Sequence, residues 1–254
     1  MLALDHRESL KKLIDPQNPE GVTSEFIARF KKEIISAVYD QISGLLIDPE
    51  YGYVAYLDLS PASPKPFLLP LEKSGYQETD DGRLTIIEKN AKEIKEMGAA
   101  GAKLLIYFNP SMEIAAKQIE TAKKAIENAH SENLPLFLEV VTYDSIPVVE
   151  SLKKLLENDV KPDVYKLEYP GSSKACEEIT KLLGEIPWIL LTKGDDFEAY
   201  CTHLKEATMA GCHGFLAGRS LWKEAAGAKD LNEREKFIKE ILPKRFERIC
   251  EIAG

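Results

Sequence analysis

The feature that most constrains this chain is a repeated order in which a short apolar, β-rich run is followed by an amphipathic helical segment. This order is typical of parallel strands buried on both faces, because each strand must return through a crossover helix. Helical spacing is clear in residues 87–94 and 115–126, where apolar residues recur at steps of three and four. The β-rich runs span residues 2–5, 43–48, 67–72, 102–108, 136–141, 163–168, 188–191 and 213–217.

The number of repeats favours a closed barrel over an open sheet. Eight βα units fit the 254 residues of the chain, which is close to the usual length of a (β/α)8 barrel. A doubly wound open sheet normally has fewer strands and a switch point in the strand order. We therefore predict an α/β fold with a single (β/α)8 TIM barrel domain over residues 1–254. Its weakest unit is the second, where only a poor helix is expected at 51–59.

Composition excludes several classes of protein. The net charge of −9 argues against a broad nucleic-acid surface, and no apolar run approaches the ~18 residues needed to cross a membrane. The four cysteines form no Cys-x-x-Cys pair, as expected of reduced thiols in a cytoplasmic protein. The four histidines are too scattered for a transition-metal site, although carboxylates could still hold Mg²⁺. We expect no cofactor, no metal, no nucleic-acid partner and no membrane partner.

Several of the predicted strands end in an acidic residue. Asp5, Asp48 and Glu72 end the first three, while Glu139 and Glu168 lie late in the fifth and sixth. In a parallel barrel the carboxyl ends of the strands converge on the active face, so these are the first candidates for chemistry.

Two lysines interrupt apolar strands, Lys103 in the fourth run and Lys166 in the sixth. Alternation places Lys166 on one face with Glu168, and an inward amine would have its pKa lowered by burial and by a neighbouring ammonium. The neutral amine attacks carbonyls, so Lys166 is a candidate for Schiff-base formation. The alternative is a buried ion-pair network of both lysines with Glu139 and Asp5. Spacing alone does not choose between the two lysines.

The last two predicted strands lead into glycine-containing turns. The seventh is followed by Thr192, Lys193 and Gly194, and the eighth by Gly218 and Arg219. The loops after these strands are the usual phosphate site of such barrels, because glycine lets backbone N–H groups approach an anion. Arg219 adds a planar fork suited to phosphate oxygens. Each turn alone is typical of a simple strand-to-helix connection, but the two together favour a phosphorylated ligand. Against this, Asp195-Asp196 could cap the next helix and so weaken an anion site.

Seven sequence blocks, in order over nearly the whole chain, resemble the class I tagatose-1,6-bisphosphate aldolase family. A sister group, the sulfofructose-1-phosphate aldolases, is similar as well, above all near the C-terminus. The blocks are LDHR (4–7), LIDPEYG (46–52), LEKSGY (71–76), GAKLL (101–105), FLE (137–139), DVYKLE (163–168) and GFLAGRSLW (214–222).

This resemblance implies a role for each candidate. The Schiff-base lysine falls on Lys166, the proton-transfer glutamate on Glu139, and the supporting lysine and aspartate on Lys103 and Asp5. Substrate and phosphate binding is expected of His6, Arg7, Thr192, Lys193, Gly194, Gly218 and Arg219. The implied reaction cleaves a phosphorylated ketose such as tagatose 1,6-bisphosphate into dihydroxyacetone phosphate and glyceraldehyde 3-phosphate. The implied partner is a small sugar phosphate, and the enzyme is expected to be a homo-oligomer.

Three alternatives stay open. The first is an aldolase that cleaves 6-deoxy-6-sulfofructose 1-phosphate to dihydroxyacetone phosphate and sulfolactaldehyde. The LIDPEYG block favours the tagatose branch, but the extra cation at Lys193 could bind a sulfonate. Metal-dependent aldol cleavage would use the carboxylates and would be lost on chelation. A protein of another class, a non-catalytic barrel that senses sugar phosphates, would gain thermal stability from ligand without turning it over.

Overall fold

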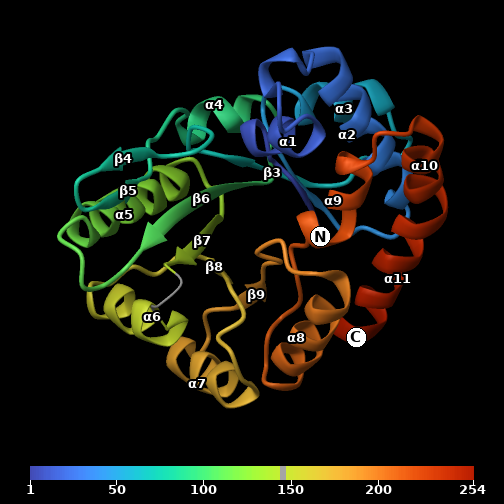
Figure 1. The fold of residues 1–254 in the computed structure, drawn as a ribbon. Helices are drawn as coiled ribbons and strands as arrows, with labels where there is room; N and C mark the ends of the chain where they lie inside the picture. Colours follow the sequence, from blue (N-terminus) through green and yellow to red (C-terminus); the bar gives the residue numbers. More distant parts are fainter. Residues whose placement is uncertain (144–146) are drawn as a thin grey trace.

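The architecture is a curled parallel sheet surrounded by helices (Figure 1). The computed structural model describes residues 1–143 and 147–254. Seven of the eight predicted runs form strands, and neighbouring strands in the sheet pair in parallel throughout. In sheet order they are β1 (Leu2–Leu4), β2 (Leu45–Ile47), β3 (Phe67–Pro70), β6 (Gly101–Phe108), β7 (Leu136–Thr142), β8 (Val164–Leu167) and β9 (Trp188–Leu190).

The eighth predicted strand, residues 213–217, forms isolated bridges instead of a regular strand. Phe215 bridges Leu190 of β9, and Ala217 bridges Leu2 of β1, both in parallel. Gly214, near the start of this run, has φ +129°, a backbone conformation that residues other than glycine rarely adopt. Among the described residues the sheet therefore has seven strands, and the prediction of an eighth is confirmed only as two bridges.

The helices cover the outside of the sheet (Figure 1). The periodic segment predicted at 115–126 lies in α5, whereas the helix predicted from residue 87 begins only at Ala91 because Asn90 forms a capping box with Glu93. The poor helix expected at 51–59 is present as α3. The helices are α1 (Glu8–Ile14), α2 (Ser24–Val38), α3 (Gly52–Leu59), α4 (Ala91–Glu96), α5 (Ala115–Ser131), α6 (Val148–Glu157), α7 (Ser173–Leu183), α8 (Phe197–Met209), α9 (Arg219–Gly227), α10 (Leu231–Lys236) and α11 (Leu242–Ala253), with a 3-10 turn at Pro19–Gly21 and a π-helix at Phe237–Ile241.

The apolar core has two parts, and the smaller one positions the site. A large cluster fills the space between sheet and helices, while a small cluster lies inside the curled sheet. We call this small cluster the apolar floor. Because it takes up the first inward positions of the strands, the next inward positions toward the carboxyl ends are left for polar residues. The floor consists of Ala3, Leu46, Leu68, Ile189 and Leu216, with Met1, Phe137 and Val164 packed against it.

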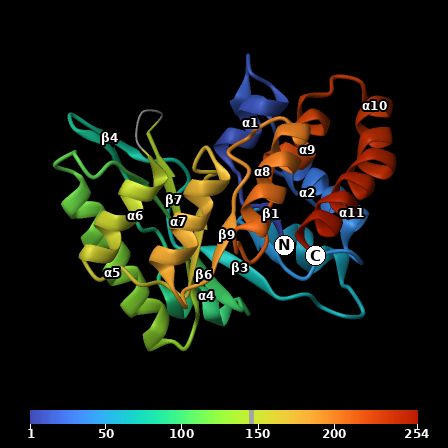
Figure 2. The ribbon, with the colours of Figure 1, turned by 90° about the horizontal axis from the view of Figure 1, so that it is seen from below.

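A two-stranded antiparallel hairpin, β4 (Gln77–Thr79) and β5 (Gly82–Leu84), lies between β3 and α4 and was not expected from the sequence. Figure 2 shows it at the same end of the molecule as α1, which follows the carboxyl end of β1. The hairpin therefore stands beside the active face that the strand ends define. No helix in the described part of the chain is long and apolar enough to cross a membrane.

Candidate active site

Three ionisable side chains from adjacent strands meet above the apolar floor. Lys103, Glu139 and Lys166 lie on β6, β7 and β8, and all three are buried. The β7–β8 register pairs Glu139 directly with Lys166. Phe137 and Val164, two positions earlier on these strands, contact the floor, so strand alternation directs Glu139 and Lys166 into the same interior one layer higher.

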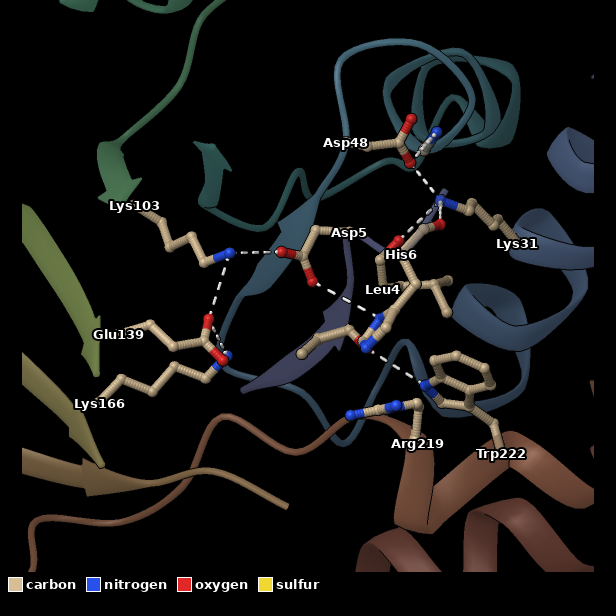
Figure 3. Close-up of polar contacts among 12 residues, drawn as sticks. Leu4, Asp5, His6, Lys31, Asp48, Lys103, Glu139, Lys166, Arg219 and Trp222 are labelled. Carbon is tan, nitrogen blue, oxygen red and sulfur yellow. Dashed lines mark hydrogen bonds and ion pairs between the residues drawn. The ribbon is translucent and has the colours of Figure 1, made fainter. Parts of the chain in front are cut away.

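These side chains form a connected network with Asp5 from the end of β1 (Figure 3). Lys166 Nζ lies 2.8 Å from Glu139 Oε2, and Lys103 Nζ lies 3.2 Å from the same oxygen. Lys103 Nζ also lies 3.0 Å from Asp5 Oδ2. The two interpretations of the sequence therefore describe the same residues, because the four candidate catalytic side chains are also a buried ion-pair network.

The charge state of the network follows from its pairing. Burial disfavours the charged form of Lys103, but the carboxylates of Asp5, Glu72 and Glu139 outweigh it and hold the pKa of Lys103 well above its ordinary value. Burial likewise opposes ionisation of Glu139, but Lys166 and Lys103 bring the pKa of Glu139 below its usual range. The pKa of Asp5 is lowered by Lys103 against the same burial cost. Lys103 is thus a fixed cation between ionised carboxylates.

Glu72 is a member of this network that the sequence placed at a strand end but not among the site candidates. Its Oε1 accepts a hydrogen bond from Lys103 Nζ at 2.5 Å, and burial raises the pKa of Glu72. Its Oε2 is buried with no hydrogen-bond partner among the described residues. In the sequence, Glu72 is marked only as an acidic residue at the end of a predicted strand. That pattern does not predict the direction of its side chain.

The turn after β9 and the start of α9 lie side by side, as the sequence predicted for a phosphate site. Arg219 donates from Nη2 to the carbonyl oxygen of Lys193 at 3.4 Å, and its guanidinium carbon lies 3.4 Å from where a Cβ on Gly194 would stand. Gly194 has φ +86°, so both backbone conformation and close approach favour glycine there. Lys223 of α9 donates to the carbonyl oxygens of Gly194 and Asp195 at 2.8 and 3.0 Å, which fixes the turn.

Lys193, in the turn after β9, has its ammonium engaged by protein. Lys193 Nζ lies 3.3 Å from Glu168 Oε1, and the other carboxylate oxygen of Glu168 accepts a hydrogen bond from Thr142 Oγ1 at 2.6 Å. Asp196 acts as the N-cap of α8, accepting from Ala199 N, as the sequence indicated.

His6 and Arg7, which follow Asp5, have different surroundings. The ring of His6 packs edge-on against Trp222 at 5.1 Å, and burial lowers its pKa to about 4, so it is neutral at pH 7. Arg7 is drawn toward the β3–α4 connection, where it pairs with Glu88 at 3.1 Å and donates to the carbonyl oxygen of Glu72 at 3.2 Å. Arg7 therefore lines the site with its charge already paired.

A second buried ion pair holds the backbone on both sides of Asp5 (Figure 3). Lys31 of α2 is fully buried and donates to the carbonyl oxygens of Leu4 and His6 at 2.9 and 2.8 Å, and it pairs with Asp48. Asp48 in turn accepts backbone N–H groups of Glu50, Tyr51 and Gly52 at the start of α3. The sequence did not reveal Lys31, since a lysine in an amphipathic helix normally faces solvent.

The candidate side chains converge on one cavity of about 480 Å³ at the carboxyl ends of the strands. The lining includes the four candidate catalytic residues and six of the seven binding candidates, while Gly194 lies behind Arg219. A larger groove of about 790 Å³ lies on the outside, between α2 and α10, away from these charges. Among the described residues, no cluster of His, Cys, Asp and Glu is arranged to hold a metal ion.

Comparison with known proteins identifies the family and the relatives of this chain. A model of the DeoC/LacD family aldolases matches residues 1–224. The tagatose 1,6-diphosphate aldolases of Staphylococcus haemolyticus and of Staphylococcus aureus strain JH9 are each 33% identical to this chain over 270 aligned residues. The alignment covers 88% of this chain and 80% of either relative.

Solved structures show the same fold at lower identity. A Schiff base-forming fructose-1,6-bisphosphate aldolase has a TM-score of 0.68 at 18% identity, covering 100% of this chain and 93% of its own. An archaeal fructose 1,6-bisphosphate aldolase has a TM-score of 0.66 at 17% identity, covering 99% and 92%. The sequence resemblance to aldolases is confirmed by the family match and the relatives, and the chain belongs to the DeoC/LacD aldolase family as a lyase of the class I type.

Proposed function

We propose that this protein cleaves a phosphorylated ketose through a Schiff base on Lys166. The observation that carries the proposal is the placement of the Lys166 amine 2.8 Å from a buried carboxylate oxygen of Glu139, inside a cavity large enough for a sugar phosphate. Glu139 takes one proton from the Lys166 ammonium, and the neutral amine is the nucleophile.

The reaction follows from the same contacts. The Lys166 nitrogen attacks the C2 carbonyl of the ketose to give a carbinolamine, and loss of water, with a proton supplied by Glu139, leaves an iminium. Glu139 then removes the proton of the C4 hydroxyl, and the C3–C4 bond breaks. The C4 to C6 fragment leaves as the aldehyde, glyceraldehyde 3-phosphate, and the electron pair of the broken bond moves into the iminium to give an enamine. Protonation at C3 and hydrolysis release dihydroxyacetone phosphate and free Lys166. Proton transfer of this kind contributes about 10²–10⁴-fold to the rate.

Lys103 supports the reaction by charge. Its ammonium lies 3.2 Å from the Glu139 oxygen that contacts Lys166, and it keeps Glu139 ionised before substrate arrives. Asp5 and Glu72 balance the charge of Lys103 and hold it in place. The phosphate at C1 binds to Arg219, Gly218 and the turn that contains Thr192, Lys193 and Gly194, so binding energy far from the reacting bond orients it.

Tagatose 1,6-bisphosphate is the proposed substrate, supported by the relatives' activity and their identity to this chain. A 6-deoxy-6-sulfofructose 1-phosphate aldolase is the second candidate. The engagement of Lys193 by Glu168 weakens the case that Lys193 serves as a dedicated sulfonate site. We also propose that residues 1–254 form one closed (β/α)8 barrel, in which the bridges of Phe215 and Ala217 close the gap between β9 and β1.

Reductive trapping tests the covalent step. Incubation with dihydroxyacetone phosphate and borohydride is expected to add a reduced adduct to the peptide that contains Lys166, found by peptide mass mapping. Lys166→Met should lose both the adduct and turnover, while Lys153→Met, at an exposed lysine paired with Glu178, serves as a matched control. A wild-type protein without an adduct on Lys166 would refute the mechanism. Ligand-induced thermal stabilisation without turnover of any ketose phosphate would instead favour a sensing barrel.

A coupled assay with tagatose 1,6-bisphosphate, fructose 1,6-bisphosphate and 6-deoxy-6-sulfofructose 1-phosphate tests the substrate. We expect the highest kcat/KM for tagatose 1,6-bisphosphate. A preference for the sulfonated sugar would overturn that part of the proposal and leave the Schiff-base mechanism standing.

A further inference from the structure

Three arginines line the cavity of the candidate active site, and they differ in the protein groups that pair with their guanidinium. Arg7 pairs with Glu88, and Arg219 donates to the carbonyl oxygen of Lys193. The guanidinium of Arg83 makes no hydrogen bond or ion pair with any residue that the structure describes, although its backbone N–H and carbonyl are both bonded. Within residues 1–143 and 147–254, Arg83 thus presents to the cavity a cation that no carboxylate pairs with.

The guanidinium of Arg83 lies among three tyrosine rings. Its central carbon is 4.6 Å from the ring centroid of Tyr76, 5.3 Å from that of Tyr107 and 5.8 Å from that of Tyr143. Aromatic rings stabilise a guanidinium through its face and leave its N–H groups free at the edge. The rings therefore hold the group in place without using the donors that bind an anion.

The hairpin that carries Arg83 is anchored at several points. Arg83 N donates to the hydroxyl of Tyr143 at 2.8 Å, Gln118 Nε2 donates to the carbonyl oxygen of Arg83 at 2.9 Å, and Ile114 N donates to Asp81 Oδ2 at 2.7 Å. Gly82 has φ +121°, and a Cβ there would lie 2.8 Å from the Tyr143 hydroxyl. Because the hairpin is fixed before ligand arrives, little ordering is needed on binding.

The position of Arg83 complements that of Arg219. Tyr107 lies on β6 four residues beyond Lys103, on the same inward face, so Arg83 stands above the reaction centre on the β6 side. Arg219 follows the 213–217 run, which bridges β9 and β1 on the opposite side of the curled sheet. Both arginines line the cavity that contains Lys166, so a ligand with an anionic group at each end would meet a cation on either side of the reaction centre.

We propose that Arg83 is the specificity-determining residue for a second, distal anion of the substrate, a terminal phosphate or sulfonate three carbons beyond the bond that breaks. This inference rests on the proposed function and deepens it, because it assigns a residue to the distal anion that both candidate substrates carry. The sugar monophosphates lack the group that Arg83 binds.

The test compares kcat/KM for fructose 1,6-bisphosphate with that for fructose 1-phosphate in the wild-type protein and in Arg83→Gln. A charge-assisted contact of this kind is expected to lower the bisphosphate to monophosphate ratio about 10- to 100-fold. Arg29→Gln, at an exposed arginine paired with Glu33 on α2, is the matched control and should keep the wild-type ratio. The same ratio measured with 6-deoxy-6-sulfofructose 1-phosphate in place of the bisphosphate distinguishes a phosphate from a sulfonate as the natural distal group.

The outcomes separate this inference from the proposed function. If the wild-type protein cleaves the bisphosphate and the ratio in Arg83→Gln stays within about threefold of wild type, the assignment of Arg83 is wrong and the aldolase proposal stands. If the wild-type protein forms no borohydride adduct and cleaves none of these sugars, both fail together. Arg83→Lys keeps the charge but loses the planar fork, so an intermediate ratio would support recognition of the anion by Arg83 over a purely structural role for the hairpin.

Discussion

Replacing Lys31 by Met removes the cation that joins α2 to the backbone on either side of Asp5. The change leaves the carboxylate of Asp48 buried without its ion-pair partner and deprives the carbonyl oxygens of Leu4 and His6 of their donor. Breaking a buried pair in this way typically costs about 3–5 kcal/mol of the free energy of unfolding. The three backbone N–H groups that still bind Asp48 place the expected loss near the lower limit, about 3 kcal/mol.

Urea unfolding followed by the fluorescence of Trp188 and Trp222, both fully buried, measures the loss. A double-mutant cycle with Asp48→Asn isolates the pair, since the asparagine oxygen can still cap α3 without carrying a charge. We expect the double variant to be at least about 1 kcal/mol more stable than the sum of the single losses predicts. We also expect kcat to fall in Lys31→Met, because Asp5 loses its fixed backbone. Losses that add to within about 0.5 kcal/mol would refute the argument that the two charges are coupled.

Further predictions concern the active site and its pH dependence. Lys103→Met should lower kcat by about 10²–10⁴-fold and should move the acid limb of the pH profile of kcat to higher pH, because Glu139 loses a cation that keeps it ionised. An acid limb at the wild-type pH would contradict this role of Lys103. Arg219→Met should lower kcat/KM for every C1-phosphorylated ketose by about 10- to 100-fold, mainly through KM, and equal kinetics with wild type would remove Arg219 from the phosphate site. Because burial lowers the pKa of His6 to about 4, the unfolded chain binds a proton between pH 6.5 and 4 that the folded protein does not, so stability falls as the pH falls through this window. Relative to His6→Gln, wild type should lose about 3 kcal/mol of unfolding free energy between pH 7 and pH 4, and parallel pH profiles for the two proteins would show that His6 is not responsible.

Much of the interior was predictable from alternation within the strands. Val164 and Lys166 are separated by one residue, so once Val164 faces the interior Lys166 must do so as well, and the same holds for Phe137 and Glu139. The positions of seven strands followed from their apolar runs. The eighth run contains the same kind of residues but pairs only as isolated bridges, and the positive φ of Gly214 within it has no signature in hydrophobicity.

Other parts could not be predicted because their signals are not local. The strands of the β4–β5 hairpin are polar and partly exposed, and the hairpin is held by contacts with Tyr143 and Gln118, which lie far along the chain. Lys31 has the sequence environment of a surface lysine, and only the approach of α2 to the ends of β1 and β2 buries it. Glu72 carries the same strand-end signal as Asp48, yet Glu72 contacts Lys103 and Asp48 caps a helix.

The apolar floor also determines how the reaction centre communicates with solvent. Its five members and the side chains packed against them seal the amino-terminal end of the curled sheet beneath Glu139 and Lys166. The cavity that Glu139 and Lys166 line lies at the opposite end of the sheet, the end at which the hairpin and α1 stand. In the proposed reaction, a ketose bound in this cavity would stand between Glu139 and bulk water, and we expect proton exchange at Glu139 to be slowest while the covalent intermediate is present.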